Sequence, residues 1–289
     1  MTESPSDSDR QAMLSAAEML GLDPQGAVLV SASSRLIWHL PTPNVAVTIS
    51  RCGMKSLASV TAETAAIRAA TAAGVRTPRL RGGPLVLAND RFALATDWLA
   101  GRTPTAVDWP AITAAAAQLT KASPVDVPIL AWPTADAAPN IAEFLGEPLA
   151  EEFAQRCIAA ARSIESLLEG DALVLAHGDL QPANVLCDAD GQAWLLDMEY
   201  ARLAPREWDP AKIAILARRF GDPPDSTKLL SAWAGLDARR LARCIAAQEA
   251  LLVFWLVRMA ARGTAGAALE SRHRAATLEQ PDARWGHLG

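Results

Sequence analysis

The feature that most constrains the fold is a change of pattern near residue 100. Before that point, short apolar runs alternate with turn residues, which is typical of strands. The strand candidates are residues 27–30, 35–40, 45–50, 84–88 and 91–96. The last two are expected to form a hairpin across Asn89 and Asp90. One alanine-rich helix is predicted over residues 59–73, with Gly74 at its C-terminal end.

Beyond Ala100 and Gly101 the chain is predicted to be mostly helical. The expected helices are residues 109–121, 141–144, 151–168, 211–220, 226–235 and 238–262. Short apolar runs at residues 173–176, 185–187 and 193–196 interrupt this series and are expected to be strands. Asp190 and Gly191 signal a hairpin between the last two.

These patterns predict an α+β fold with two lobes. Residues 1–96 are expected to form an N-terminal lobe with an antiparallel sheet and one main helix, after a mobile tail at residues 1–10 and a helix at residues 11–20. Residues 97–101 would be the hinge, and residues 102–289 a larger, mostly helical lobe. A chain of this length can form two lobes around a cleft.

Composition limits the classes of function. The chain is 51% hydrophobic and has a formal net charge of −5, which suits a globular protein and argues against a nucleic-acid partner. The polar N-terminus is unlike a signal peptide, and the apolar run at residues 250–257 is much shorter than the ~20 residues that span a bilayer. The four cysteines are scattered and are expected to be free thiols. We therefore expect a cytoplasmic protein without a membrane partner.

One polar segment carries the chemical argument. It contains His177, Gly178 and Asp179, followed by Asn184 and then Asp197. Because it lies between predicted strands, its side chains are displayed from turns on a rigid frame. Phosphoryl transfer needs a carboxylate to accept or orient the acceptor proton, and oxygen ligands to hold Mg²⁺. Asp179 is the candidate for the first role, and Asn184 with Asp197 for the second.

The spacing resembles the H-R-D-x-x-x-x-N loop and the later D-F-G of protein kinases. Here glycine replaces arginine and Asp-Met-Glu replaces Asp-Phe-Gly, which is more similar to the aminoglycoside phosphotransferase and choline kinase-like family of small-molecule kinases. The resemblance extends over roughly residues 25–260. It implies a protein-kinase-like fold, the cofactors ATP and Mg²⁺, Asp179 as base, and Asn184 and Asp197 as metal ligands. Glu199 would add to the acidic metal site.

Two further residues are expected to support the loop. A histidine in this position more often packs and hydrogen-bonds than transfers a proton, so His177 is assigned a structural role. Asp209 matches an aspartate that receives backbone N–H bonds from the catalytic loop in the family. Asp209 is also suited to cap the helix that begins near Pro210, and the two roles are compatible.

The resemblance also assigns the nucleotide-binding half of the site. Ser33 and Ser34 would lie in the phosphate loop. Glu63 on the first-lobe helix would pair with a phosphate-binding lysine. Main-chain groups near Asp97 and Leu99, in the hinge, would bind the adenine edge.

The strand lysine of the family is missing. Thr48 falls where it is expected, because no lysine lies on the strand at residues 45–50. Arg51, just beyond the strand, is a candidate to replace it, because it could turn inward and pair with Glu63, and Lys55 is a further candidate. A missing cation would leave phosphate charge unneutralised and slow the transfer.

We therefore expect an ATP-dependent O-phosphotransferase that acts on a small molecule of the aminoglycoside, amino-sugar, sugar or amino-alcohol type, as a monomer or homodimer. The alternative is a nucleotide-binding pseudokinase with a sensing or scaffolding role, which the missing lysine favours. The later helices are expected to build the acceptor pocket. Candidate side chains are Glu143, Glu147, Glu151, Glu152, Glu249, Trp132, Trp233 and Trp255. Solvation of the acids and core packing of the tryptophans are the ordinary alternatives.

Overall fold

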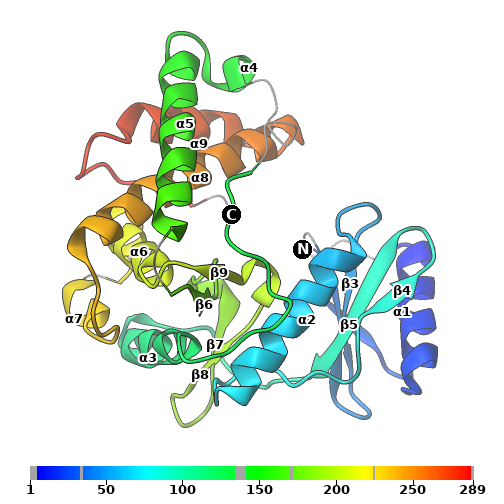
Figure 1. The fold of residues 1–289 in the computed structure, drawn as a ribbon. Coiled ribbons are helices and arrows are strands. Elements are labelled where there is room, and N and C mark those ends of the chain that lie inside the picture. Colours follow the sequence, from blue (N-terminus) through cyan, green and yellow to red (C-terminus); the bar gives the residue numbers. More distant parts are fainter. Residues whose placement is uncertain (1–4, 33–34, 134–140, 170–171, 224, 288–289) are drawn as a thin grey trace.

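A computed structural model describes residues 5–32, 35–133, 141–169, 172–223 and 225–287, and within them the N-terminal part forms a five-stranded antiparallel sheet flanked by two helices (Figure 1). The strand order is β1-β2-β3-β5-β4. The elements are α1 Asp7–Leu20, β1 Val28–Ala32, β2 Arg35–Leu40, β3 Val45–Ser50, α2 Leu57–Ala72, β4 Leu85–Leu87 and β5 Arg91–Asp97.

The two faces of the sheet have different partners. Leu36 and Trp38 of β2 are buried in a core that the sheet shares with α1. Successive side chains of a strand point to opposite faces, so Arg35 lies on the face away from α1. In the ladder between β2 and β3, Arg35 is opposite Ser50, and Thr48 lies two residues before Ser50 on β3. Arg35 and Thr48 therefore share one face of the sheet.

Local turn chemistry explains two of the connections. Asn89 and Asp90 join β4 to β5 with φ angles of 60° and 51°, and Asn and Asp tolerate this left-handed region better than most residues. Gly74, with φ 78°, follows α2, and the amides of Gly74 and Val75 bond back to carbonyls of its last turn.

The C-terminal part is mostly helical and contains two short two-stranded ladders, β6 with β9 and β7 with β8. Both ladders lie between α2 and the C-terminal helices (Figure 1). The elements are α3 Trp109–Leu119, α4 Ile141–Leu145, α5 Leu149–Leu168, β6 Val174–Ala176, β7 Val185–Cys187, β8 Ala193–Leu195, β9 Arg202–Ala204, α6 Trp208–Ile215, α7 Thr227–Leu230, α8 Ala238–Ala261 and α9 Ala267–Thr277.

Helix α2 is packed into the C-terminal part. Its buried residues Ala66, Ile67 and Ala70 belong to the same core as Ile112 of α3 and Leu195 of β8. The core between the sheet and α1 is a separate cluster. Helix α2 therefore bridges the sheet and the short strands that carry the polar segment.

The expected α+β class is confirmed, with corrections in detail. Residues 7–10 are the first turn of α1, where Ser6 caps the helix, so the expected tail was wrong there. The helix expected at residues 226–235 is limited to Thr227–Leu230. Helix α6 begins three residues before its expected start and continues as a π-helix over Leu216–Phe220. Strand β9 and helix α9 were not expected.

Helix α8 is long and apolar enough to cross a membrane by length and composition alone, with a mean hydropathy of 1.6 over its apolar window. Half of that window is buried inside the protein, and the helix packs against α5, α6 and α9. Core helices of globular proteins pass the same test, so a single such helix among the described residues is weak evidence for a membrane span.

Candidate active site

Asp179 lies on the loop that joins β6 to β7, and its carboxylate is held on both sides. Lys212 Nζ on α6 is 2.9 Å from Oδ1. Gln181 Nε2 donates to Oδ2 at 2.8 Å, and Asn184 Nδ2 donates to the same oxygen at 2.9 Å. Three donors therefore fix the direction of this carboxylate.

The surroundings of Asp179 favour its charged form. Burial alone would raise the pKa of Asp179, but the nearby charge and hydrogen bond of Lys212 outweigh it and hold the pKa below its ordinary value. The charge of His177 and the Asn184 hydrogen bond act in the same direction. Sequence reasoning missed Lys212, although its place three residues after Asp209, on the same helix face, was the available signal.

His177 and Asp209 form the base of the loop. Asp209 Oδ2 accepts from the backbone N–H of His177 at 2.7 Å, and Oδ1 accepts from that of Gly178 at 3.0 Å. The His177 side chain is fully buried, and its Nε2 lies 2.8 Å from the carbonyl oxygen of Leu196. Burial raises the pKa of Asp209 above its ordinary value. The loop is thereby tied both to α6 and to the segment after β8.

Gly178 is required by the closeness of a second backbone segment. Its φ is +82°, a region that side chains rarely adopt. A Cβ added here would lie 2.1 Å from the carbonyl oxygen of Tyr200. The glycine between His177 and Asp179 thus allows the loop between β6 and β7 to lie against the turn after Asp197.

Asp197 has an unsatisfied oxygen. It adopts a left-handed conformation with φ 55° directly before the turn Met198–Tyr200. Its Oδ2 forms an ion pair with Arg35 of β2. Its Oδ1 is buried without a hydrogen-bond partner among the described residues. Buried acceptors are nearly always paired, so this atom is the kind of donor that a bound cation would complete.

Asn184 offers a second oxygen on the same side of the loop. It donates Nδ2 both to the Asp179 carboxylate and to the Asp179 carbonyl oxygen, at 2.9 Å each, so its Oδ1 points away from Asp179. Its own carbonyl oxygen accepts from the N–H of Leu196, next to Asp197, at 2.9 Å. Among the described residues, no group of three His, Cys, Asp or Glu side chains forms a ready-made metal cluster. A cation site here would therefore use Asn184 together with Asp197.

A chain of ion pairs links the sheet, α2 and the turn after β8. Arg35 Nη1 is 2.9 Å from Glu63 Oε1, and Lys55 Nζ is 2.8 Å from Glu63 Oε2. Lys55 Nζ is also 2.8 Å from Glu199 Oε2. Burial would lower the pKa of Arg35, but the carboxylates around it raise the pKa above its ordinary value, so Arg35 stays charged.

The cations that the structure places on Glu63 are thus Arg35 and Lys55. Arg51 donates Nη2 to the carbonyl oxygen of Ala32 at 2.9 Å. Arg35 was not considered in the sequence analysis, although it is a cation on the face of β2 opposite its apolar residues. Ser33 and Ser34, expected in the phosphate loop, lie outside the described residues.

The residues expected to form the hinge occupy the end of β5 and the segment after it. The Asp97 N–H donates to the carbonyl of Arg79 at 2.9 Å, so this amide is not available to a nucleotide. The Asp97 side chain is paired with Arg81. The N–H of Trp98 is also used, by the carbonyl of Asn44. Leu99 follows directly and is partly buried.

Tyr200 lies next to the carboxylates of the site and was also missed. The residue as a whole is 49% exposed. Burial and the charges of Glu199, Asp179 and Asp197 raise the pKa of Tyr200 to about 12. Its phenol is therefore neutral at ordinary pH and able to donate a hydrogen bond from the rim of the site.

Two candidates for the acceptor pocket, Glu249 and Trp233, are buried among residues of the C-terminal part. Glu249 of α8 is buried and accepts from Arg219 Nε at 2.6 Å, and it is also paired with Arg218. Trp233 is 5% exposed and belongs to the core around α3. The other glutamates, Glu143, Glu147, Glu151 and Glu152, are exposed, as is Trp255. Trp132 packs near Phe254.

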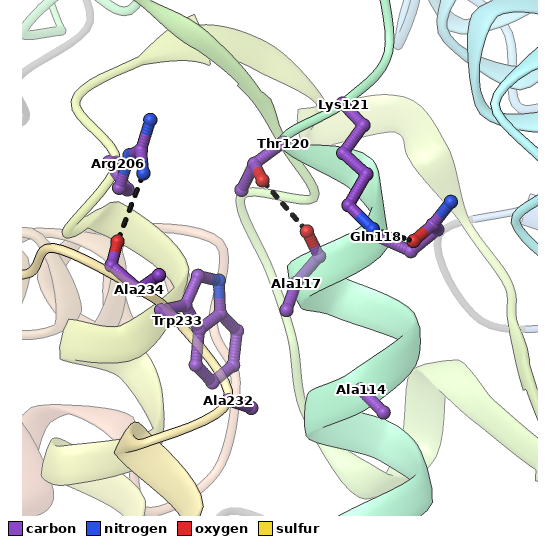
Figure 2. A pocket seen from close by; sticks show the side chains of 9 residues that line it. All are labelled: Ala114, Ala117, Gln118, Thr120, Lys121, Arg206, Ala232, Trp233 and Ala234. Atoms are coloured by element: carbon purple, nitrogen blue, oxygen red, sulfur yellow. Dashed lines mark hydrogen bonds between the residues drawn. The ribbon is translucent and has the colours of Figure 1, made fainter.

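A pocket of about 480 Å³ lies beside Trp233, between the end of α3 and the segment after α7. Figure 2 shows the side chains that line it. Its polar lining includes Lys121 and Arg206, each engaged in a hydrogen bond with a neighbour that also lines the pocket. None of the residues around Asp179 lines it. Trp233 therefore belongs to this separate pocket.

Comparison with known proteins identifies the family of the chain. The sequence model of the phosphotransferase enzyme family (APH) matches residues 29–246, well over half of the chain. Among solved structures, an amicoumacin kinase in complex with AMP-PNP, Ca²⁺ and Ami superposes with a TM-score of 0.77 at 12% identity, covering 97% of this chain and 96% of that one. A comparison with curated protein sequences finds no significant match.

Two further structures show the same fold. A choline/ethanolamine kinase family protein from Mesorhizobium loti has a TM-score of 0.64 at 19% identity, covering 93% of this chain and 95% of that one. A choline kinase from Streptococcus pneumoniae has a TM-score of 0.66 at 11% identity, covering 94% and 99%. The family model matches the strands, α2 and the whole polar segment. The chain belongs to the phosphotransferase enzyme family.

Proposed function

We propose that the chain transfers the γ-phosphoryl group of ATP to a hydroxyl of a small molecule of the aminoglycoside, amino-sugar, sugar or amino-alcohol type. Family membership assigns phosphotransfer to a hydroxyl acceptor as the class of reaction. The observation that carries the specific proposal is the pair of carboxylates on adjoining backbone segments. Asp179 is fixed by three donors, and Asp197 has a buried oxygen without a partner among the described residues.

Asp179 is the proposed base. The acceptor oxygen forms a bond to the γ-phosphorus while the bond between that phosphorus and the β–γ bridging oxygen breaks. The electron pair of the broken bond leaves with ADP, and the hydroxyl proton passes to the Asp179 carboxylate. A lowered pKa makes Asp179 a weak base, so its main contribution is to orient the hydroxyl until the proton becomes acidic in the transition state.

Asn184 and Asp197 are the proposed ligands of Mg²⁺. An amide oxygen and a carboxylate are hard donors of the type that this ion prefers, and the unpartnered Oδ1 of Asp197 fits the assignment. When bound, the ion would neutralise phosphate charge. His177 and Asp209 would keep the loop in place, and Glu199 would contribute negative charge beside the ion.

The nucleotide would lie between the sheet and the polar segment. We assign Ser33 and Ser34 to phosphate binding, and main-chain groups at Asp97 and Leu99 to the adenine edge. The Asp97 N–H is already bonded to Arg79, so Asp97 would contribute its carbonyl. Glu63 would position the cations around it.

A nucleotide-binding pseudokinase is the alternative. The threonine at position 48, where the family has its lysine, favours it. A cation beside Glu63, Arg35 of β2, supports the enzyme instead, because its guanidinium can neutralise phosphate charge from a neighbouring strand.

The test is release of ADP from Mg-ATP with a panel of hydroxylated acceptors. Asp179→Asn keeps the shape of the side chain and removes its charge, and the loss of a general base is expected to reduce turnover by roughly 10²- to 10⁴-fold. Asp190→Asn, an exposed aspartate in the β7–β8 hairpin, is the matched control and is expected to behave as wild type. Mg-ATP affinity should fall in Asp197→Ala. Binding of Mg-ATP without turnover of any acceptor above the Asp179→Asn level would favour the pseudokinase.

A further inference from the structure

The cations beside Glu63 come from two places outside β3. Arg35 is the first residue of β2, and Lys55 precedes α2. Both contact Glu63, through its two different oxygens. Thr48, on β3, shares the sheet face of Arg35 but carries no charge.

Lys55 bridges two carboxylates and so has a structural role. Its Nζ lies 2.8 Å from Glu63 and 2.8 Å from Glu199, so one ammonium group is shared between two carboxylates. Its side chain is 13% exposed. This arrangement joins α2 to the turn after β8 and leaves little of the positive charge for another anion.

Arg35 is placed differently. One arm of its guanidinium donates to Glu63 at 2.9 Å, and the other contacts Asp197, the proposed metal ligand. A guanidinium has five N–H donors in a planar fork, which matches the oxygens of a phosphate. Arg35 can therefore keep Glu63 with one arm and exchange its second partner.

The charges of the cluster suggest which exchange takes place. Arg35 and Lys55 oppose Glu63, Asp197 and Glu199, which leaves one net negative charge among these five buried or largely buried groups. A polyanionic phosphate chain would be repelled from such a cluster unless one cation turned toward it. A cation bound at Oδ1 of Asp197 would neutralise this carboxylate and so weaken the attraction between its Oδ2 and Arg35.

We propose that Arg35 is the phosphate-binding cation of this site, and that its contact with Asp197 is the resting contact that Mg-ATP replaces. The proposal rests on the proposed function. The phosphate-binding cation would then lie on β2 and not on β3, where Thr48 takes the position of the family's lysine.

The experiment compares the affinities of Mg-ATP and of adenosine by calorimetry. Arg35→Met is expected to weaken Mg-ATP binding roughly 10- to 100-fold, the range for losing a hydrogen bond to a charged group. Adenosine has no phosphate, so its affinity should stay within about two-fold. Arg91→Met is the control, because Arg91 has a similarly buried side chain in the same sheet and pairs with Asp9 of α1 at 2.9 Å. It should leave both affinities unchanged.

The outcomes separate this proposal from the one before it. Wild-type protein that does not bind Mg-ATP overturns the proposed function, and this inference with it. Unchanged Mg-ATP affinity in Arg35→Met, or equal losses for Mg-ATP and adenosine, overturns the role of Arg35 alone. If Arg35→Met does not fold, Arg35→Lys replaces it in the experiment, because lysine keeps the positive charge but lacks the planar guanidinium. It is expected to weaken Mg-ATP several-fold and spare adenosine, and equal effects on both ligands would again overturn the proposal.

Discussion

Gly178→Ala tests whether the closeness of two backbone segments sets the geometry of the site. The added Cβ would lie 2.1 Å from the carbonyl oxygen of Tyr200 and 2.8 Å from its carbonyl carbon. Because real Cβ contacts are essentially never under 3.0 Å, one backbone segment must move by about 0.9 Å, the difference between 3.0 and 2.1 Å. Gly191→Ala is the matched control, since Gly191 has a similar φ of +72° and no atom within 4 Å of the added Cβ.

Both variants lose stability because alanine must adopt a left-handed backbone conformation. Only Gly178→Ala also introduces a steric overlap. A left-handed conformation costs a non-glycine residue ~1–2 kcal/mol, and alanine recovers ~0.4–1 kcal/mol by restricting the unfolded chain. Gly191→Ala should therefore lose about 1 kcal/mol. Gly178→Ala adds the steric overlap, for which overpacking typically costs ~1–3 kcal/mol, so its total is roughly 2–4 kcal/mol. A displacement near 1 Å beside Asp179 should also reduce turnover about 10²-fold.

Urea denaturation of both variants gives the free energies of unfolding, and ADP release gives the turnover. The reasoning is refuted if Gly178→Ala and Gly191→Ala lose the same stability and retain the same turnover. It is also refuted if Gly178→Ala is less stable but keeps wild-type turnover, because the loop would then have moved without displacing Asp179.

Two other substitutions test the assignments of buried charges. Lys212→Met removes the cation that keeps the pKa of Asp179 low, so Asp179 should stay protonated to higher pH. The acidic limb of the pH–turnover profile is expected to move to higher pH, and the stability that a depressed carboxyl pKa contributes above its unfolded value should be lost; an unmoved limb contradicts this. Glu249→Gln leaves the fully buried Arg219 without its carboxylate and is expected to cost about 3–5 kcal/mol in urea denaturation, with no change in acceptor KM. A raised KM without lost stability would return Glu249 to the acceptor site.

Local patterns predicted the elements that carry the site. The bounds of β2, β3 and β7 agree with the apolar runs in the sequence, because alternation and turn residues are properties of neighbours along the chain. Strand β9 was missed since three residues are too few for a pattern. Helix α9 was missed because its sequence is polar on average.

The partners within the site were harder to predict. Arg35 and Glu63 are 28 residues apart, and Lys212 and Asp179 are 33 apart, so their contacts depend on how whole elements pack. The motif identified the carboxylates by spacing alone. It did not identify the cations that accompany them, because a cation can reach the same carboxylate from several elements. Arg51 and Lys55 were considered for their nearness to β3 in sequence, whereas Arg35, on the neighbouring strand β2, was not considered.

The packing of α2 has a mechanical consequence. The expected hinge would divide the chain at residues 97–101, but the hydrophobic cores divide it elsewhere, since α2 is embedded with α3 and β8 while the sheet packs on α1. Any movement of the sheet relative to the C-terminal part would therefore slide the sheet over α2 and leave α2 in place. Glu63 would stay in register with Asp197, and Arg35 would travel with the sheet. The ion pairs of Arg35 with Glu63 and Asp197 would then hold the sheet against α2 and the turn after β8 and would have to break when the sheet moves.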